Sequence, residues 1–241
     1  MHNLLRKQII ILWILICVFA KNAFAQQTEI NRPERDDAPY FLGATLGYNN
    51  SYLHAIKSTK FIQSDTVLVA QTGSSGGVTI GLLGTARLFS NYLQVRFNPQ
   101  ILIGSARYFT YQFGVAPNNQ PAYQKKTLPA NIVSFPFQIK FQSDRINNFR
   151  VYLLGGIKYD IYFSGNSPDA SAQEIQFKSS DFGIEAGIGC SFYFPFFTLS
   201  PELKVSDGLS NILIQKPNNP YANVFDKIQT RMIMFSLHFE Y

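Results

Sequence analysis

Residues 180–194 read Ser-Asp-Phe-Gly-Ile-Glu-Ala-Gly-Ile-Gly-Cys-Ser-Phe-Tyr-Phe, and an apolar residue stands at every second position from Phe182 to Phe194. The positions between them hold three glycines, a glutamate, a serine and a tyrosine. Because successive side chains of a β-strand point to opposite faces, this stretch predicts a strand with one apolar and one polar face. Alternating segments of about 10 residues are typical of β-barrels that cross a membrane.

Seven further stretches of the chain alternate in the same way. They are 40–49, 77–89, 93–103, 128–141, 149–163, 197–205 and 228–241. The resulting total of eight strands is even, as in single-chain bacterial barrels. We therefore predict an all-β fold, an eight-stranded antiparallel transmembrane β-barrel that occupies residues 40–241.

The connections between these strands alternate in length. Long polar connections are expected at 50–76, 106–127, 164–179 and 206–227, and short ones at 89–91, 142–148 and 195–196. Outer-membrane barrels have long extracellular loops and short periplasmic turns. We therefore expect both ends of the barrel chain in the periplasm, with residues 26–39 as a polar periplasmic lead segment.

A soluble β-sandwich is the alternative fold, since it can also contain eight alternating strands. A sandwich does not account for the regular succession of long and short connections. It also does not account for the aromatic end of the last strand, which resembles the C-terminal signal of outer-membrane barrels and comprises Phe235, Phe239 and Tyr241.

Three prolines fall within the predicted strands, at Pro99, Pro136 and Pro201. Each removes a backbone donor from the strand ladder, and a closed barrel has no edge strand that tolerates this loss. We expect β-bulges or strand ends at these positions.

The composition agrees with a membrane barrel. Of the 241 residues, 46% are hydrophobic and 15% are charged, where a soluble domain has about 25% charged residues. The mean hydropathy of −0.02 excludes a bundle of transmembrane helices, and the high aromatic content excludes a disordered chain.

The first 25 residues are typical of a secretory signal peptide. Arg6 and Lys7 precede an apolar run at 9–20, and Ala23-Phe24-Ala25 forms a cleavage site before Gln26. We expect cleavage between Ala25 and Gln26, and export to the outer membrane of a Gram-negative bacterium. Cys17 lies inside the apolar run, so it is not the cysteine of a lipoprotein.

Without the three cations of this leader, the net charge falls from +6 to +3. So small an excess does not indicate a nucleic-acid partner. Cys190 is the one cysteine left, which excludes an intramolecular disulfide. We expect the partners to be outer-membrane lipid and the barrel-assembly machinery.

An eight-stranded barrel, of the size of the small OmpA/OmpX-type barrels, is only wide enough to be filled by its own side chains. Alternation places nine charged residues on its inner face, namely Arg87, Arg96, Lys140, Lys158, Asp160, Glu185, Glu202, Lys204 and Glu240. Charges in so narrow a space must be paired or hydrated. We expect a network of salt bridges there; a conducting or ligand-binding lumen is the alternative.

Few residues indicate catalysis. Ser236 and His238 share one face of the last strand, but the sequence places no third orienting group beside them. No cluster of Cys and His residues suggests a metal site. We expect a non-enzymatic protein without a cofactor, and a lipid-modifying enzyme that uses His238 is the catalytic alternative.

The connection at 142–148 is long for its side of the barrel. The residues in or beside it that suit a docking site for a partner are Asp144, Arg145, Asn147, Asn148 and Arg150. The alternative is a turn in which Asn and Asp cap the backbone.

Residues 137–158 (Phe-Gln-Ile-Lys-Phe-Gln-Ser-Asp-Arg-Ile-Asn-Asn-Phe-Arg-Val-Tyr-Leu-Leu-Gly-Gly-Ile-Lys) resemble PorT-family proteins of Bacteroidetes. So do Ser200-Pro201-Glu202-Leu203-Lys204 with Gly208-Leu209-Ser210-Asn211, and the last strand from Arg231 to Glu240. The similarity spans residues 40–241 and is strongest over 140–156. Val151 departs from the family, which often has proline there, and the loop at Asp207 differs too.

PorT-family proteins are outer-membrane barrels associated with the type IX (Por) secretion system, which exports proteins that carry a C-terminal sorting domain. The resemblance implies an accessory or assembly component of that system, with other type IX components as partners. A stand-alone surface barrel that binds ligands or cells through its extracellular loops is the alternative.

Overall fold

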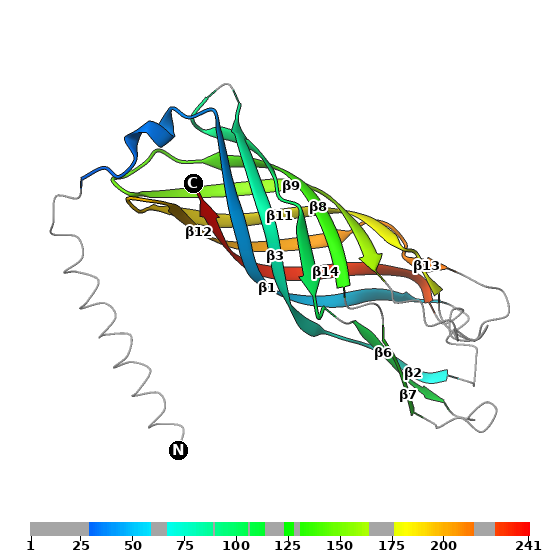
Figure 1. The fold of residues 1–241 in the computed structure, drawn as a ribbon. Coiled ribbons are helices and arrows are strands. Elements are labelled where there is room, and N and C mark those ends of the chain that lie inside the picture. The colour runs from blue at the N-terminus through cyan, green and yellow to red at the C-terminus, as the bar shows by residue number, and fades with distance from the viewer. Residues whose placement is uncertain are drawn as a thin grey trace, which may run out of the picture.

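The computed structural model describes residues 29–58, 67–88, 90–105, 107–113, 123–127, 131–163, 176–214 and 225–241. Its strands form a tilted ring (Figure 1). In chain order the ring contains β1 (Tyr40–Lys57), β3 (Ser75–Arg87), β4 (Leu93–Phe97) with β5 (Gln100–Ile103), β8 (Asn131–Gln142), β9 (Phe149–Phe163), β11 (Ser180–Tyr193), β12 (Thr198–Gly208) and β14 (Phe225–Glu240). No helix within these described ranges is long and apolar enough to cross a bilayer.

The ring closes through the first and last of these strands. β1 and β14 pair antiparallel from Gly43 opposite Glu240 to Lys57 opposite Phe225. β1 also pairs with β3. Each other strand of the ring pairs with the ring strands that come before and after it in the chain. Because β4 and β5 share one position in the ring, the barrel has eight strand positions.

The two faces of the ring are the reverse of those in a soluble protein. Apolar side chains point outward, as with Ile188, which is 57% exposed, whereas the inward side chain of Glu185 is 5% exposed. A sandwich would bury its apolar faces between two sheets. The prediction of an eight-stranded membrane barrel is therefore confirmed.

Several of the predicted strand boundaries differ from the observed ones. β1 continues to Lys57 rather than ending at residue 49, and parts of the expected loops are strands. β2 (Val67–Gly73), β6 (Tyr108–Phe113) and β7 (Tyr123–Thr127) form a three-stranded sheet, and β10 (Gln176–Phe177) pairs with β13 (Leu213–Ile214). These small sheets lie in the stretches where the sequence analysis expected loops.

The prolines do not produce the expected bulges. Phe97 lies opposite Phe137 and Gln100 opposite Ser134, so the register between β4–β5 and β8 is unchanged across Pro99 and Pro136. The carbonyl oxygen of Pro136 accepts a bond from the N–H of Asn98 (3.2 Å). Similarly, the register of β12 with β11 is the same on both sides of Pro201. Pro99 does lie at a strand end, because it separates β4 from β5. Pro136 and Pro201 each remove one ladder bond and leave their strands continuous.

The barrel has two different ends. The short connections that follow β3, β8 and β11 lie at one end together with residues 29–39 and Tyr241, and we call this the turn end (Figure 1). The opposite end, which carries β2, β6, β7, β10 and β13, is the loop end. At the turn end, the short 3₁₀-helix η1 (Pro33–Asp36) precedes β1.

A lysine placed on the apolar outer face tests whether lipid covers it. Ile188→Lys, near the middle of β11, is expected to lower the free energy of unfolding by about 2–4 kcal/mol. Ile56→Lys, on the part of β1 beyond the membrane, is expected to cost about 0–1 kcal/mol. The measurement is urea unfolding of refolded protein in lipid vesicles, followed by gel mobility. Equal effects at both positions would contradict a lipid-facing β11.

Candidate functional site

Arg96 forms the centre of a polar network inside the barrel. Its guanidinium is completely buried on β4 and contacts two carboxylates from the far side of the ring. The Nη1 to Oε2 distance to Glu202 is 2.7 Å, and the Nη2 to Oε1 distance to Glu240 is 3.2 Å. Tyr152 donates its hydroxyl to Glu202 at 3.0 Å. These contacts link β4 across the lumen to β9, β12 and β14.

His238 lies in the same network. Its Nδ1 is 2.8 Å from the hydroxyl of Thr45, and its Nε2 is 3.3 Å from Glu202. The hydroxyl of Ser236 is buried and makes no hydrogen bond to any described residue. The required contact between nucleophile and base is therefore missing among the described contacts, and both side chains face the lumen, away from lipid. This geometry does not favour a lipid-modifying site at His238.

The network continues toward the loop end as separate pairs. Lys204 lies 3.4 Å from Glu185, and Lys158 lies 2.6 Å from Asp160. Ser134 donates to Asp160 at 2.5 Å. Of the nine charged residues expected on the inner face, eight are buried inside the ring, and Arg87 lies part-buried at its turn end. Charged side chains, most of them in ion pairs, thus fill the interior that the described strands enclose.

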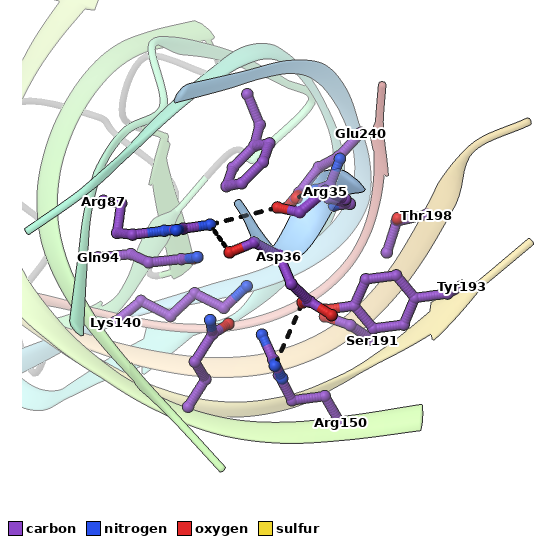
Figure 2. A pocket seen from close by; sticks show the side chains of 12 residues that line it. Arg35, Asp36, Arg87, Gln94, Lys140, Arg150, Ser191, Tyr193, Thr198 and Glu240 are labelled. Carbon is purple, nitrogen blue, oxygen red and sulfur yellow. Dashed lines mark hydrogen bonds and ion pairs between the residues drawn. The ribbon is translucent and has the colours of Figure 1, made fainter. Parts of the chain in front are cut away.

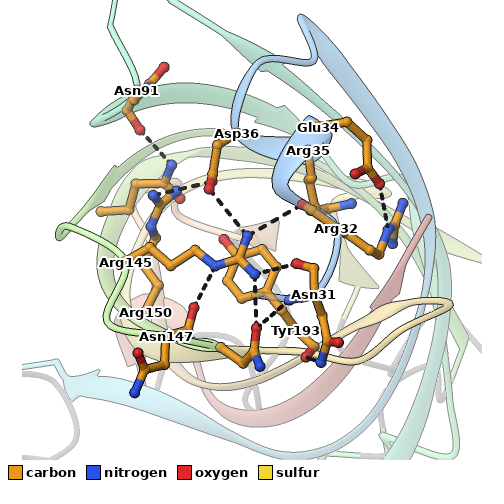
Figure 3. A network of polar contacts seen from close by, with 12 residues as sticks. Asn31, Arg32, Glu34, Arg35, Asp36, Asn91, Arg145, Asn147, Arg150 and Tyr193 are labelled. Carbon is orange, nitrogen blue, oxygen red and sulfur yellow. Dashed lines mark hydrogen bonds and ion pairs between the residues drawn. The ribbon is translucent and has the colours of Figure 1, made fainter. Parts of the chain in front are cut away.

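Residues 31–37 lie across the turn end of the barrel (Figure 3). Arg35 of η1 inserts its side chain, forms a buried ion pair with Glu240, and lies 4.2 Å from the ring centroid of Phe41. Burial lowers the pKa of Arg35, and Glu240 opposes that shift. Arg87 donates to the backbone carbonyls of Arg35 and Asp36. The expected periplasmic lead is therefore packed against the barrel.

Arg145 and Arg150, two residues of the expected docking site, contact this segment. Arg145 lies 3.1 Å from one carboxylate oxygen of Asp36, and Arg150 lies 3.3 Å from the other. Arg145 also donates to the backbone carbonyl of Asn31, and its guanidinium lies 3.9 Å from the ring centroid of Tyr193. Both arginines are thus occupied by contacts within the chain.

The other residues of the expected docking turn also make local contacts. Asn148 accepts from the N–H of Asn31 at 2.8 Å, and Asn147 adopts a left-handed backbone (φ 54°) that asparagine tolerates. Asp144 accepts from Tyr92 at 2.8 Å, and this bond raises the pKa of the Tyr92 hydroxyl. The turn is therefore a capped, ordered support for residues 31–37.

The C-terminal aromatic residues lie at the turn end. Phe235 and Phe239 face outward, and Tyr241 is 83% exposed. Phe239 lies 6.1 Å from Phe197, whose ring stacks on Phe194 at 5.0 Å. Aromatic rings at this level are typical of the girdle at a membrane interface. The expected cleavage site at Ala25 and Gln26 lies outside the described residues.

Sequence reasoning missed Asp36 and Arg35 as parts of the site. They stand in a short polar run that carries no periodic pattern. Their partners are 109 and 205 residues away along the chain. Only the folded ring brings these residues together. No group of His, Cys, Asp and Glu suited to a metal ion is found within the described ranges.

Comparison with known proteins finds a family model, described as outer membrane protein beta-barrel domain, that matches residues 24–213. Among solved structures, Neisserial surface protein A is 12% identical (TM-score 0.39), with 82% of this chain and 95% of that chain covered. OprG from Pseudomonas aeruginosa is 13% identical (TM-score 0.44; 85% and 95% covered). Ail from Yersinia pestis is 12% identical (TM-score 0.36; 85% and 100% covered). No curated protein sequence matches the chain.

Removing Arg96 tests the central network. Arg96→Met removes the arginine that pairs with Glu202 and leaves Glu240 paired with Arg35 alone. The loss is expected to cost about 3–5 kcal/mol of unfolding free energy. Replacing Glu202 by Gln in the same chain should recover part of that loss. Arg231→Met removes an exposed pair with Asp207 and should cost about 0–1 kcal/mol. If urea unfolding gave the same small loss for both arginines, the central network would not stabilise the barrel.

Removing Arg145 tests the attachment of residues 31–37. Trypsin cleaves after arginine and lysine but not before proline, so it does not cut the Arg32–Pro33 bond. Cleavage after Arg35, whose side chain is buried, therefore reports on how firmly residues 31–37 are held. In the folded protein, Arg145→Ala is expected to speed cleavage after Arg35 about tenfold or more, because it removes charge-assisted hydrogen bonds. Mass spectrometry of timed digests measures this rate. Lys178→Ala, at the loop end, should leave the rate unchanged, and an unchanged rate in Arg145→Ala would contradict the attachment.

Proposed function

Because the chain belongs to the family of outer membrane protein beta-barrel domains and lies in the outer membrane of a Gram-negative bacterium, we propose that it is a non-enzymatic accessory or assembly component of the type IX secretion system. In this proposal the turn end faces the periplasm, as short connections do in outer-membrane barrels. The other type IX components are its partners.

The observation that carries the proposal is the ordered surface at the turn end. Charged side chains fill the lumen, so a secreted protein has no route through this barrel and the work falls to its surfaces. Arg145 and Arg150 join the turn after β8 to residues 31–37 as one support. On that support Ile146 is 71% exposed and Ile30 is 59% exposed. Exposed apolar side chains beside a fixed polar frame favour a protein-docking surface.

The resemblance to PorT-family proteins supports the same surface. Its strongest part, residues 140–156, contains the turn after β8. The backbone of Ile146 pairs with Phe149 in both directions, at 2.9 and 3.0 Å, which fixes the turn while the Ile146 side chain points to solvent. Ile146 is therefore the residue whose change alters the surface but not its support.

The loop end favours a second candidate, a surface barrel that binds ligands or cells. β1 has 18 residues and β14 has 16, whereas about 9–11 tilted residues cross a bilayer. The excess length carries the strands beyond the membrane, toward the sheet of β2, β6 and β7. Such a sheet is a surface on which a ligand can bind.

Fractionation of a cargo with a sorting domain tests the first candidate. In the source organism, deletion of the gene is expected to trap this cargo in the periplasm, and the wild-type gene should restore export. Ile146→Glu should restore export poorly, because it places a charge on the docking surface. Ile56→Glu, a matched change at an exposed isoleucine of the loop end, should restore it fully.

Each result separates the candidates. Normal export in the deletion strain would reject the type IX role. A deletion defect that Ile146→Glu fully repairs would reject the docking surface at the turn end. Both variants are compared at equal amounts of folded protein in the outer membrane, shown by gel mobility before and after heating.

A further inference from the structure

A pocket opens at the turn end, between η1 and the inner wall of the barrel (Figure 2). We call it the mouth pocket; its charged lining residues are Arg35, Asp36, Arg87, Lys140, Arg150 and Glu240. Four of these are cations and two are carboxylates. Figure 2 shows Arg87, Gln94 and Lys140 reaching into it from neighbouring strands, and Arg150 reaching in from β9.

Both carboxylates are already neutralised by specific partners. Glu240 lies between Arg35 and Arg96, and the two oxygens of Asp36 are held by Arg145 and Arg150. Arg87 and Lys140 are the two lining cations with no carboxylate at ion-pair distance among the described residues, although Glu240 attracts Lys140 from farther away. The lining as a whole carries more cations than carboxylates.

Lys140 is the less usual of the two. Its side chain is 2% exposed, and its ammonium group lies 4.0 Å from the ring centroid of Tyr152. Among the described residues it has no ion pair and no hydrogen bond. The carboxylates of Glu240 and Glu202 attract it from beyond ion-pair distance. A buried ammonium without a close, hydrogen-bonded carboxylate is costly, so such a group normally has an anion beside it. Arg87 donates to backbone carbonyls and meets no described carboxylate.

Other donors of the same pocket also lack acceptors. Nη1 of Arg35, Nε of Arg87, Nε of Arg150 and the hydroxyl of Thr198 are buried, and none has a hydrogen-bond partner in the described part of the chain. All four residues line the mouth pocket. Unsatisfied buried donors cost free energy. A ligand that satisfies them must bring several acceptor oxygens, and the excess charge requires it to be negative.

We propose that the mouth pocket binds a small tetrahedral oxyanion of the phosphate or sulfate type. Lys140 and Arg87 supply the charge, and the free donor of Arg150 supplies a further hydrogen bond. The anion enters from the aqueous side, because these side chains point into the ring and away from lipid. A bound anion ties η1 to β3 and β8. The proposal is independent of the role in secretion.

Calorimetric titration of the refolded barrel in zwitterionic detergent tests the site. Inorganic phosphate and sulfate are titrated separately, at constant ionic strength. Both should bind saturably to the wild type. Lys140→Met should weaken binding about tenfold or more, because a hydrogen bond to a charged group is lost. Lys140→Arg should keep binding within a few-fold, and Lys178→Met, an exposed lysine of the loop end, should bind as the wild type.

Several results would overturn the proposal. One is the absence of saturable binding of either anion to the wild type, and another is equal affinity in Lys140→Met. Binding that occurs only to vesicles with phosphatidylglycerol would make the ligand a lipid phosphate rather than a free anion, and would also overturn it. Arg87→Met is the second loss variant, in case Lys140→Met does not fold; gel mobility before and after heating verifies folding of each variant.

Discussion

Lipid offers no hydrogen-bond partner to the backbone, and this constraint shapes the whole chain. The sheet meets it by closing on itself, with β1 paired to β14 along their shared length. Closure at eight strands makes a lumen that only side chains can fill. The inward positions must therefore be polar enough to suit a wet, narrow interior, and their charges must find partners inside the barrel.

The interior follows from that requirement. Arg96 bridges the carboxylates of Glu202 and Glu240 across the ring, and Glu240 in turn holds Arg35 of the N-terminal segment. The same set of charges thus fills the lumen and fastens residues 31–37 over the turn end. Because the interior is occupied, the two ends differ mainly in what they carry: residues 31–37 cover the turn end, and the sheet of β2, β6 and β7 lies at the loop end (Figure 1).

Part of this structure could be predicted from the sequence, and part could not. Alternation at Phe182–Phe194 and in seven other stretches indicated the ring, because lipid imposes a period of two on every spanning strand. Alternation ends where lipid ends, so it indicated neither the continuation of β1 to Lys57 nor the sheet of β2, β6 and β7. Alternation also predicts which face of a strand a cation occupies, but it does not predict which carboxylate pairs with that cation. Nothing in the sequence therefore indicated that the fold places Asp36 beside Arg145.

Conductance in planar lipid bilayers tests the central claim, that paired charges fill the lumen, most directly. The protein is refolded, verified by gel mobility, and inserted from dilute detergent under a steady potential. A filled barrel is expected to insert without opening a steady ohmic channel. Stable open-channel currents from correctly folded wild-type protein would contradict the account, because ions would then be passing through the space that Arg96 and its partners occupy.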